Sequence, residues 1–577
     1  MTNLCGRRHG GPPDILHLFR SAPDSIKPTA AQGAPNVFRL LPSGVEQMQL
    51  SHSFHPMHVA PRRTTRDTAP RARSGADPAA RLARCPPAVL RAAVACIFAL
   101  AAVGCSATDA ATGTVATTPL NPVAPAVPAA PAVLSANTHQ LVIVGVAFAY
   151  DASKAGSAFS DPVGGGLTYT VTLTPAGGGL AASGAIISGA PAGATAVRAT
   201  ITATAANGAA TSNTFYIVAV ASGLASPTLP SAPASYSDAS APLPALYVVA
   251  PPGAGPPAVG ADNTPADNAI TNAGATLGRV LFHDKRVSVN DAVACASCHL
   301  QAAGFADTAR LSRGFAGGFT GRHSMALANA RFYARGRFFW DERAATLEAQ
   351  VVTPIQDAVE MGMTLDALEA KLSLLPYYPS LFQAAFGTPA VTRDRIAKAL
   401  AQFVRSMTSR NAKFDRAFNG AGVPDFAATF TAAELLGAQL FGIAPPAPGV
   451  PNAGCVRCHG SNALISDNIH NTGLDATTID AGAGNAQFKA PSLRNVGVRG
   501  RYMHDGRFVS LAEVVEFYDA NVNAHPNLDN RLRAGPGGPP LRLGLSAAQK
   551  SALVTFLHTL TDSVMLGDAR FSSPFPP

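Results

Sequence analysis

The motif Cys-x-x-Cys-His stands at Cys295-Ala-Ser-Cys298-His299 and again at Cys455-Val-Arg-Cys458-His459. This is the pattern at which haem is attached covalently in c-type cytochromes. Two thiols one helical turn apart can bond both vinyl groups on one edge of a porphyrin, which leaves the next residue under the iron. The motifs therefore predict two covalently bound c-type haems, with His299 and His459 as axial iron ligands.

Other uses of paired cysteines explain these motifs less well. Zinc sites place two such pairs about 15–20 residues apart, whereas more than 150 residues separate Cys298 from Cys455. Zinc binding also does not require a histidine after each pair. A redox-active cysteine pair explains one motif but not both, so covalent haem is the interpretation that we carry forward.

The positive charge of the chain is concentrated at its beginning. The formal net charge of the 577 residues is +9, but residues 1–104 alone hold 13 Lys and Arg against 5 Asp and Glu. The remaining residues are therefore nearly neutral, and the sequence predicts no nucleic-acid partner. With 14% charged and 47% hydrophobic residues, the chain has a globular composition and enough length for several domains.

Residues 1–104 have the composition of a leader with an export signal, which predicts a periplasmic protein. Eight arginines between positions 62 and 91 precede an apolar run at residues 92–103, which is too short for a permanent membrane helix. Residues 102–105 resemble a lipobox, which predicts a lipid anchor at Cys105 and attachment to the outer membrane. Simple cleavage after Ala101 is the alternative, and translation starting at Met57 or later would explain the length of the leader.

A β-rich region follows between two segments rich in Pro and Ala. Residues 105–135 and 223–262 have the composition of linkers. Between them, residues 136–222 alternate in period two, as in Leu167-Thr-Tyr-Thr-Val-Thr-Leu173, and Gly-rich turns separate the runs. The pattern predicts an all-β sandwich.

This region resembles the Ig or cadherin-like domains of bacterial surface proteins. The resemblance rests on Phe159-Ser160-Asp161, Leu167-Thr168-Tyr169 and Asn207-Gly208, in that order. Related domains often bind calcium at an acidic turn, but residues 162–165 supply no carboxylate. We expect a spacer or docking module. The alternative is a sandwich that itself binds glycan or a surface partner, for which the sequence offers no aromatic cluster.

Beyond residue 262 the hydrophobic periodicity becomes helical. Ile396, Ala399, Leu400, Phe403 and Val404 fall on one face of an amphipathic helix. The pairs Thr431/Glu434 and Ser546/Gln549 are capping boxes that open two more helices. The sequence therefore predicts a multidomain chain, in which the β-sandwich precedes two mostly α, cytochrome c-like haem domains at residues 263–420 and 421–565.

Five short segments around the haem motifs resemble the bacterial dihaem cytochrome c peroxidase and MauG family. They are LGRVLF at 277–282, FWDERA at 339–344, PIQDAVEMG at 354–362, APSLRN at 490–495 and YMHDG at 502–506. The resemblance implies an oxidoreductase that reduces hydrogen peroxide at the first, peroxidatic haem and receives electrons through the second. A small cytochrome or another redox protein is the implied electron donor.

The resemblance also implies residues of the reaction site. Glu360 lies in the distal pocket of the first haem, where Gln350 and Pro354 line the same cavity, and Trp340 lies between the two haems. Splitting of peroxide needs one group that takes a proton from the near oxygen and returns it to the leaving oxygen. A carboxylate at Glu360 can do both. The alternatives are a core anchor for Trp340, a role that can hold together with charge transfer, and a solvated helix-end carboxylate for Glu360, which the flanking motif makes the weaker interpretation.

The distal ligand of the second haem separates the branches of the family. The position fourteen residues after His504, where peroxidases that need prior reduction have Met, is occupied by Tyr518, as in MauG-like members. A hard phenolate oxygen lowers the potential of a haem, whereas a soft thioether raises it. Met503 and His504 are weaker candidates for the same iron, and an aromatic core residue is the plain alternative for Tyr518.

Residues 300–322 contain no histidine that would block the first iron at rest. The sequence therefore predicts a first haem that meets peroxide without prior reduction, although His323 is close enough in sequence to serve as a ligand. His323 also replaces the Asn that supports an interhaem calcium ion in family members, which argues against calcium. Whether the chain forms a homodimer is left open.

Three functions follow from these observations. The first is a dihaem peroxidase, and the second is a MauG-like enzyme that oxidises a protein side chain during cofactor maturation. The third is a dihaem electron carrier without enzyme activity. A carrier has no use for Glu360 and Gln350 beside an open iron, so this pocket is the feature that distinguishes an enzyme from a carrier.

Overall fold

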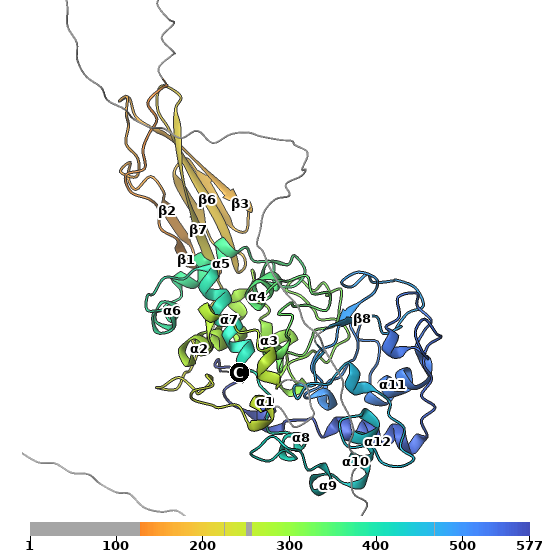
Figure 1. Ribbon diagram of the computed structural model, residues 1–577. Helices are drawn as coiled ribbons and strands as arrows, with labels where there is room; N and C mark the ends of the chain where they lie inside the picture. The colour runs from red at the N-terminus through yellow and green to blue at the C-terminus, as the bar shows by residue number, and fades with distance from the viewer. Residues whose placement is uncertain (1–126, 224, 250–256, 467, 577) are drawn as a thin grey trace, which may run out of the picture. The chain divides into compact units, whose positions relative to one another are not determined.

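The computed structural model describes residues 127–577 except 224, 250–256, 467 and 577. The predicted leader at residues 1–104, the predicted lipid anchor at Cys105 and most of the first linker therefore lie outside the described residues. Within the described part, no helix is long and apolar enough to cross a membrane. The order along the chain is a β-rich region followed by a mostly helical region, as the sequence predicts (Figure 1).

The β-rich region consists of two sheets that share one hydrophobic core. One sheet has the order β1-β7-β6-β3, in which only β1 and β7 are parallel, and the other has the order β2-β5-β4. Side chains from both sheets meet in the core, among them Phe215 of β7 and Ile187 of β5, which are fully buried. The strands are β1 (Gln140–Ile143), β2 (Phe148–Asp151), β3 (Thr168–Thr174), β4 (Leu180–Ser183), β5 (Ile186–Gly189), β6 (Thr195–Thr204) and β7 (Ala210–Val220).

The period-two pattern is visible in the strands themselves. Along β6, residues 197, 199, 201 and 203 are buried and alternate with more exposed positions. Because successive side chains of a strand point to opposite faces, this alternation places one face of the sheet on the core. The predicted β-rich region is confirmed, and its assignment as an Ig or cadherin-like sandwich stays a prediction.

The rest of the described chain is built from short helices and long loops. We call residues 263–420 the first half and residues 421–565 the second half of the helical region. The second half also contains a small two-stranded ribbon, β8 (Ile469–His470) with β9 (Phe488–Lys489). The helices are α1 (Ala245–Val248), α2 (Asn272–His283), α3 (Cys295–Cys298), α4 (Leu347–Gln356), α5 (Leu365–Leu374), α6 (Tyr378–Phe386), α7 (Arg393–Ser406), α8 (Lys413–Arg416), α9 (Phe426–Thr429), α10 (Ala432–Phe441), α11 (Leu511–Glu516), α12 (Ala547–His558) and α13 (Ser563–Gly567).

Three helices that the sequence predicts are confirmed. Helix α7 buries the predicted apolar face, from Ile396 to Val404. Helices α10 and α12 both begin with the predicted capping boxes, since Thr431 and Ser546 each accept a backbone N–H while Glu434 and Gln549 bond back. Local sequence signals therefore fix where these helices begin.

The two helical halves each contain one close helix crossing. In the first half, a Cβ added at Gly278 of α2 would lie 2.0 Å from the Ala399 carbonyl oxygen of α7. In the second half, a Cβ at Gly437 of α10 would lie 2.1 Å from the Ala552 carbonyl oxygen of α12. Only glycine allows two helix backbones to approach this closely. The same kind of glycine crossing therefore occurs in both halves of the helical region.

The described parts of the segment at residues 223–262 pack against the helical halves. Tyr247 of α1 is fully buried, and its hydroxyl donates a hydrogen bond to the Ser409 carbonyl over 2.5 Å and accepts one from Asn329. Arg331 pairs with Asp238 over 2.9 Å and also with Asp262. A segment with buried aromatic anchors and ion pairs is held in place, so it is more than a spacer.

Candidate haem and peroxide site

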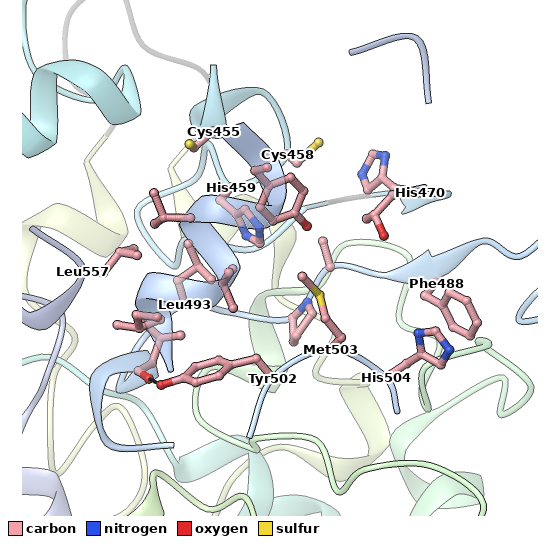
Figure 2. Close-up of a pocket in the computed structure, with 18 of the residues that line it drawn as sticks. Cys455, Cys458, His459, His470, Phe488, Leu493, Tyr502, Met503, His504 and Leu557 are labelled. Atoms are coloured by element: carbon pink, nitrogen blue, oxygen red, sulfur yellow. Dashed lines mark hydrogen bonds between the residues drawn. The ribbon is translucent and has the colours of Figure 1, made fainter. Parts of the chain in front are cut away.

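The second Cys-x-x-Cys-His motif lies on the wall of a cavity of about 240 Å³ (Figure 2). Cys455 begins a 3₁₀ turn, and both of the motif's cysteines and His459 line the cavity. Most of the wall is apolar, which suits the hydrophobic face of a porphyrin. The apolar lining includes Leu493, Val496, Leu511, Val515, Leu553 and Leu557.

The donor groups of both motifs have the chemistry that a c-type haem requires. Cys295, Cys298, Cys455 and Cys458 are all free thiols. The Nδ1 atom of His299 lies 3.0 Å from the Phe305 carbonyl, and that of His459 lies 3.3 Å from the Leu464 carbonyl.

These contacts set the tautomer of both histidines. A carbonyl oxygen only accepts hydrogen bonds, so Nδ1 carries the proton in both rings and Nε2 keeps its lone pair for a metal. Burial lowers the pKa of His459 to about 4 and lowers that of His299 as well, which keeps both rings neutral. The residues present therefore fit two haems with these histidines as axial ligands.

Tyr518 lines the same cavity as Cys455, Cys458 and His459. Its helix, α11, widens at this point into a π-helical turn, Phe517–Asn521, and such turns are frequent at functional sites. Burial, followed by the nearby cysteines, raises the pKa of the Tyr518 phenol. A bound cation is what would favour a phenolate here.

The two weaker candidates for this iron have different surroundings. The His504 ring stacks on Phe488 at 3.7 Å between ring centroids, and its Nε2 atom lies 3.9 Å from Asp480 (Figure 2). Met503 also lines the cavity and has a positive φ of 71°. His504 is thus already engaged by neighbouring side chains, and Tyr518 and Met503 remain as distal donors.

Trp340, which belongs to the first half, also lines the cavity of the second half. Its indole Nε1–H donates to the His323 carbonyl over 2.7 Å, and its own carbonyl accepts from the Lys489 N–H over 2.8 Å. Phe339 and Glu342, on either side, have positive φ values of 69° and 54°. Such strained backbone persists where the surroundings hold it in place, and it is common at functional sites.

An ion-pair bridge fixes the Trp340 loop to the second half. Arg322 donates to Asp341 over 2.6 Å and, with two nitrogens, to Asp480 over 2.7 and 2.8 Å. The paired, forked contact to Asp480 gives directional as well as electrostatic stabilisation. The residue after Trp340 is therefore tied to the loop that leads into β9.

Glu360 lies in the loop after α4, with its side chain partly buried. The Glu360 N–H donates to the Asp357 carboxylate over 3.0 Å, and the Glu360 carbonyl accepts from the Phe315 N–H over 3.0 Å. A Cβ added at Gly314 would lie 1.7 Å from the Val359 carbonyl oxygen, so the opposing loop packs tightly against this one. These contacts hold the Glu360 backbone in one position.

The Glu360 loop contacts the segment that precedes the first haem motif, where the Val289 N–H donates to the Met361 carbonyl over 3.0 Å. Burial raises the pKa of Cys295 to about 12 and that of Cys298 to about 11, and the charge of Glu360 contributes to both shifts. Burial, followed by the charge of Asp357, also raises the pKa of Glu360 itself. A carboxyl group with a raised pKa beside the first motif is suited to exchange a proton.

Gln350 and Pro354 lie one turn apart on α4, so both project from the same face of the helix. The apolar side of α4 packs in the core that also contacts Cys295. Pro354 has no N–H to donate to the Gln350 carbonyl, which loosens the helix at this turn. The Gln350 side-chain amide makes no hydrogen bond within the described part of the chain, and it is available to a ligand.

Sequence reasoning missed several polar residues of the second cavity. His470 lies with Nδ1 2.7 Å from Asp529 and Nε2 2.9 Å from the Ser466 hydroxyl. Burial alone would lower its pKa, but the hydrogen bond to Asp529 outweighs this and raises the pKa to about 9. The partners are far apart in the sequence, and no spacing rule joins them.

Among described residues, no cluster of three His, Cys, Asp or Glu side chains could hold a calcium ion.

Comparison with known proteins identifies relatives of the helical region. The sequence model of the di-haem cytochrome c peroxidase family matches residues 272–422. Methylamine utilization protein MauG of Methylophilus methylotrophus is 31% identical over 321 residues, which cover 54% of this chain and 88% of the relative. Cytochrome-c peroxidase IdrP1 of Denitromonas iodatirespirans is 28% identical over 355 residues, with coverage of 54% and 88%.

One solved structure extends the comparison. The crystal structure of a MauG-like protein associated with microbial copper homeostasis is 30% identical, with a TM-score of 0.47, and the match covers 54% of this chain and 96% of the other. The family predicted from the sequence is confirmed by the sequence model of the family and by the MauG relative. The chain is an oxidoreductase that belongs to the di-haem cytochrome c peroxidase and MauG family, whose cofactor is haem.

Proposed function

We propose that this chain is a dihaem c-type peroxidase that reduces hydrogen peroxide at its first haem. Cys295, Cys298 and His299 hold that haem, and the pair Cys455 and Cys458 with His459 holds a second haem through which electrons arrive. A haem bound at the first motif supplies an open iron position and electrons for peroxide. The observation that supports the proposal most strongly is a carboxyl group, Glu360, with a raised pKa near the first motif.

Glu360 carries the proton transfer in this proposal. Its carboxylate oxygen accepts the proton of the near peroxide oxygen and then gives it to the far oxygen as the O–O bond breaks. The proton moved from the near oxygen lets the far oxygen leave as water. The two electrons and two protons that the overall reaction takes up then convert the near oxygen to the second water. A raised pKa helps the second transfer, because it makes the protonated carboxyl group easier to form near neutral pH.

The other predicted residues position the reactants. The free amide of Gln350 is suited to orient peroxide, and Pro354 forms the adjacent part of the wall. Trp340 lines the cavity proposed for the second haem, although its loop belongs to the first half. This position supports a role of Trp340 in passing electrons between the two haems. The Trp340 loop is held by Arg322 and by the His323 carbonyl.

Replacement of Glu360 by Gln tests this proposal. The Glu360→Gln variant keeps the size of the side chain but cannot exchange a proton, so kcat/KM for peroxide should fall about 10²–10⁴-fold. Steady-state assays with a reduced small cytochrome as donor measure the fall. The haem content, measured by pyridine haemochrome absorbance, should stay at two per chain.

A matched control shows whether the effect is specific to the Glu360 carboxylate or follows from the loss of any carboxylate. Glu516→Gln removes a surface carboxylate of α11 that pairs with Lys550 over 2.6 Å. This variant should keep the kcat/KM of the wild type. If Glu360→Gln retains full activity, Glu360 is not the acid–base group and the proposed site is wrong.

A MauG-like enzyme is the second candidate, and Tyr518 is the observation that favours it. A Tyr donor in a π-helical turn suits a haem of low potential that is oxidised rather than reduced. In that case the electrons come from a side chain of a protein substrate. Under either proposal we place the enzyme in the periplasm, with the β-rich region as a spacer or docking module.

A further inference from the structure

Two buried polar atoms on the wall of the second cavity have no partner in the protein. Among the described residues, three buried side-chain nitrogen atoms lack a hydrogen-bond partner: His323 Nε2, Arg494 Nε and Arg499 Nε. Of these three residues, His323 and Arg499 line the cavity. Leaving a buried polar atom unpaired costs about 1–3 kcal/mol, so two on one wall indicate a ligand that pairs with them.

The surroundings of His323 determine what its free nitrogen can bind. His323 is only 4% exposed, and its Nδ1 atom lies 3.2 Å from the Arg310 carbonyl. Because a carbonyl only accepts, Nδ1 carries a proton and Nε2 is a free proton acceptor on the cavity wall. Burial lowers the pKa of His323, and the nearby charge of Arg499 lowers it further. Both side chains line the same cavity.

Arg499 brings a positive charge to the same wall without a carboxylate beside it. Its Nη2 atom donates to the Ser492 and Arg494 carbonyls, both over 2.7 Å, which leaves Nε–H unpaired. Burial lowers the pKa of Arg499 to about 10, and only Tyr502 acts against this shift. A buried guanidinium N–H without a partner favours a ligand whose oxygen atom accepts its hydrogen bond.

Two other charged groups of the wall already have partners. Asp529 is the only carboxylate that lines the described cavity, and it pairs with His470 over 2.7 Å. The Lys489 ammonium donates to the Arg337 carbonyl over 3.1 Å and lies 3.7 Å from the centre of the Tyr333 ring. Arg457 and Arg501 also line the wall and form no ion pair in the described part of the chain. Among the described basic side chains of this wall, Arg499 is the one with a buried nitrogen that has no hydrogen-bond partner.

We propose that Arg499 and His323 form a subsite that binds one propionate group of the second haem. This inference rests on the proposed placement of that haem at Cys455 and Cys458. The propionate binds as its protonated acid: its carbonyl oxygen accepts the Arg499 Nε–H, and its O–H donates to His323 Nε2. Both unpaired atoms are satisfied by one group that every haem carries.

The subsite also connects the haem edge to Trp340. The His323 carbonyl accepts the Trp340 indole N–H over 2.7 Å, and the His323 N–H donates to the His504 carbonyl over 2.8 Å. The backbone of one residue thus positions the indole, while its side chain contacts the propionate. Arg499 and His323 are positioning residues in this arrangement.

The test measures the midpoint potential of the second haem by spectroelectrochemistry in the full-length, haem-loaded protein. Arg499→Gln removes the charge next to the propionate, so oxidised haem becomes easier to form. The ratio of oxidised to reduced second haem at the wild-type midpoint should rise about tenfold, a fall of ~59 mV in potential. Arg499→Lys keeps the charge and should retain most of the wild-type potential, and the first haem should not change.

Arg531→Gln is the matched control on the same wall. Arg531 shares Asp529 with His470, at 3.9 Å, but its side chain is 38% exposed, so water screens its charge and this variant should change the ratio by less than about threefold. An equal shift in Arg531→Gln, or an unchanged potential in Arg499→Gln, overturns the subsite. If Arg499→Gln loses the second haem while Arg499→Lys and Arg531→Gln keep it, the requirement for charge at residue 499 is supported.

A double-variant cycle tests whether the two side chains bind one group. His323→Leu should also shift the potential, and the shift of the double variant with Arg499→Gln should differ from the sum of the single shifts, since both residues contact one carboxyl group. Additive shifts refute a shared carboxyl group. Wild-type protein whose Cys455–Cys458 peptide carries no haem by mass spectrometry would instead refute the proposed placement of the cofactor.

Discussion

Tyr518 and Met503 offer the second haem two donor atoms of opposite character on one cavity wall. A phenolate oxygen is hard and lowers the potential of a haem, whereas a thioether is soft and raises it. We therefore expect Tyr518→Met to raise the midpoint potential of the second haem by on the order of 100 mV, since axial ligands set haem potentials over a wide range. A spectroelectrochemical titration measures this.

The control for this prediction is Met503→Leu, which removes the sulfur but leaves the phenol. It should keep the wild-type potential and spectrum of the second haem. If Met503→Leu shifts the potential and Tyr518→Met does not, Met503 is the distal ligand.

Glu360 predicts a pH dependence of peroxide turnover. Burial and Asp357 raise the pKa of Glu360 above its ordinary value of 4.5. The group must be deprotonated to accept a proton from peroxide, so kcat/KM should rise with pH through the raised pKa and level off above it. Rate profiles measured between about pH 4 and 8 should show this limb in the wild type and lose it in Glu360→Gln. An identical limb in the variant would assign it to another group.

At the level of single residues, the sequence predicts what local spacing encodes. Cys295, Cys298 and His299 follow from one short motif, whereas the role of Tyr518 is implied only by the resemblance to the family and stays a prediction. The pairing of His470 with Asp529 and the proximity of His323 to Arg499 join residues more than 50 positions apart. Such contacts depend on the folded chain, and no periodicity in the sequence predicts them.

Elements with strong local signals are predictable for the same reason. The amphipathic face of α7 and the capping boxes of α10 and α12 lie where the sequence places them. The π-helical turn at Phe517–Asn521 and the close helix crossings carry no such signal. A crossing depends on two helices that meet only after folding, so its glycine looks ordinary in the sequence.

The crossings predict the effect of adding one methyl group. Gly278→Ala and Gly437→Ala each place a Cβ within about 2 Å of a backbone carbonyl of the partner helix, at 2.0 and 2.1 Å respectively. Overpacking of this kind costs roughly 1–3 kcal/mol, because the helices must move apart. We expect a lower free energy of unfolding for both variants in urea titrations followed by circular dichroism.

Gly420→Ala is the control for these variants. A Cβ at Gly420 meets no atom within 4 Å, and the residue does not have a positive φ. Its free energy of unfolding should stay within about 0.5 kcal/mol of the wild type. Equal losses in all three variants would mean that the crossings are not especially tight.

At the scale of the whole chain, the two haem-binding halves are joined through the Trp340 loop. Arg322 links Asp341 of the first half to Asp480 of the second. Arg322→Gln breaks both contacts, so we expect electron transfer between the haems to slow by on the order of tenfold as Trp340 loses its fixed position. In a stopped-flow experiment, the second haem is reduced first, and the rate at which the first haem then becomes reduced measures electron transfer between the haems.

Arg343→Gln provides the comparison for that rate. Arg343 also pairs with Asp341, over 2.9 Å, but its side chain is 48% exposed and makes no ion pair with Asp480. Electron transfer in this variant should match the wild type. A rate that is unchanged in Arg322→Gln would show that the ion-pair bridge does not position Trp340.

The order of regions along the chain follows from composition and periodicity, but their packing does not. The change from period two to helical periodicity predicts the β-rich region before the helical halves. The Pro-rich segment at residues 223–262 has the composition of a linker, yet Tyr236 and Tyr247 are buried within it. Sparse aromatic anchors in a Pro-rich background do not change an average composition, so this packing is not apparent from the sequence.

The most direct measurement of the central claim is the addition of hydrogen peroxide to the fully oxidised protein, without any reductant, followed by visible and near-infrared absorbance. An open first haem with Glu360 beside it predicts a rapid spectral change in the wild type and a much slower one in Glu360→Gln. An inert wild-type protein whose resting spectrum shows two low-spin, six-coordinate haems would contradict the proposed peroxide site.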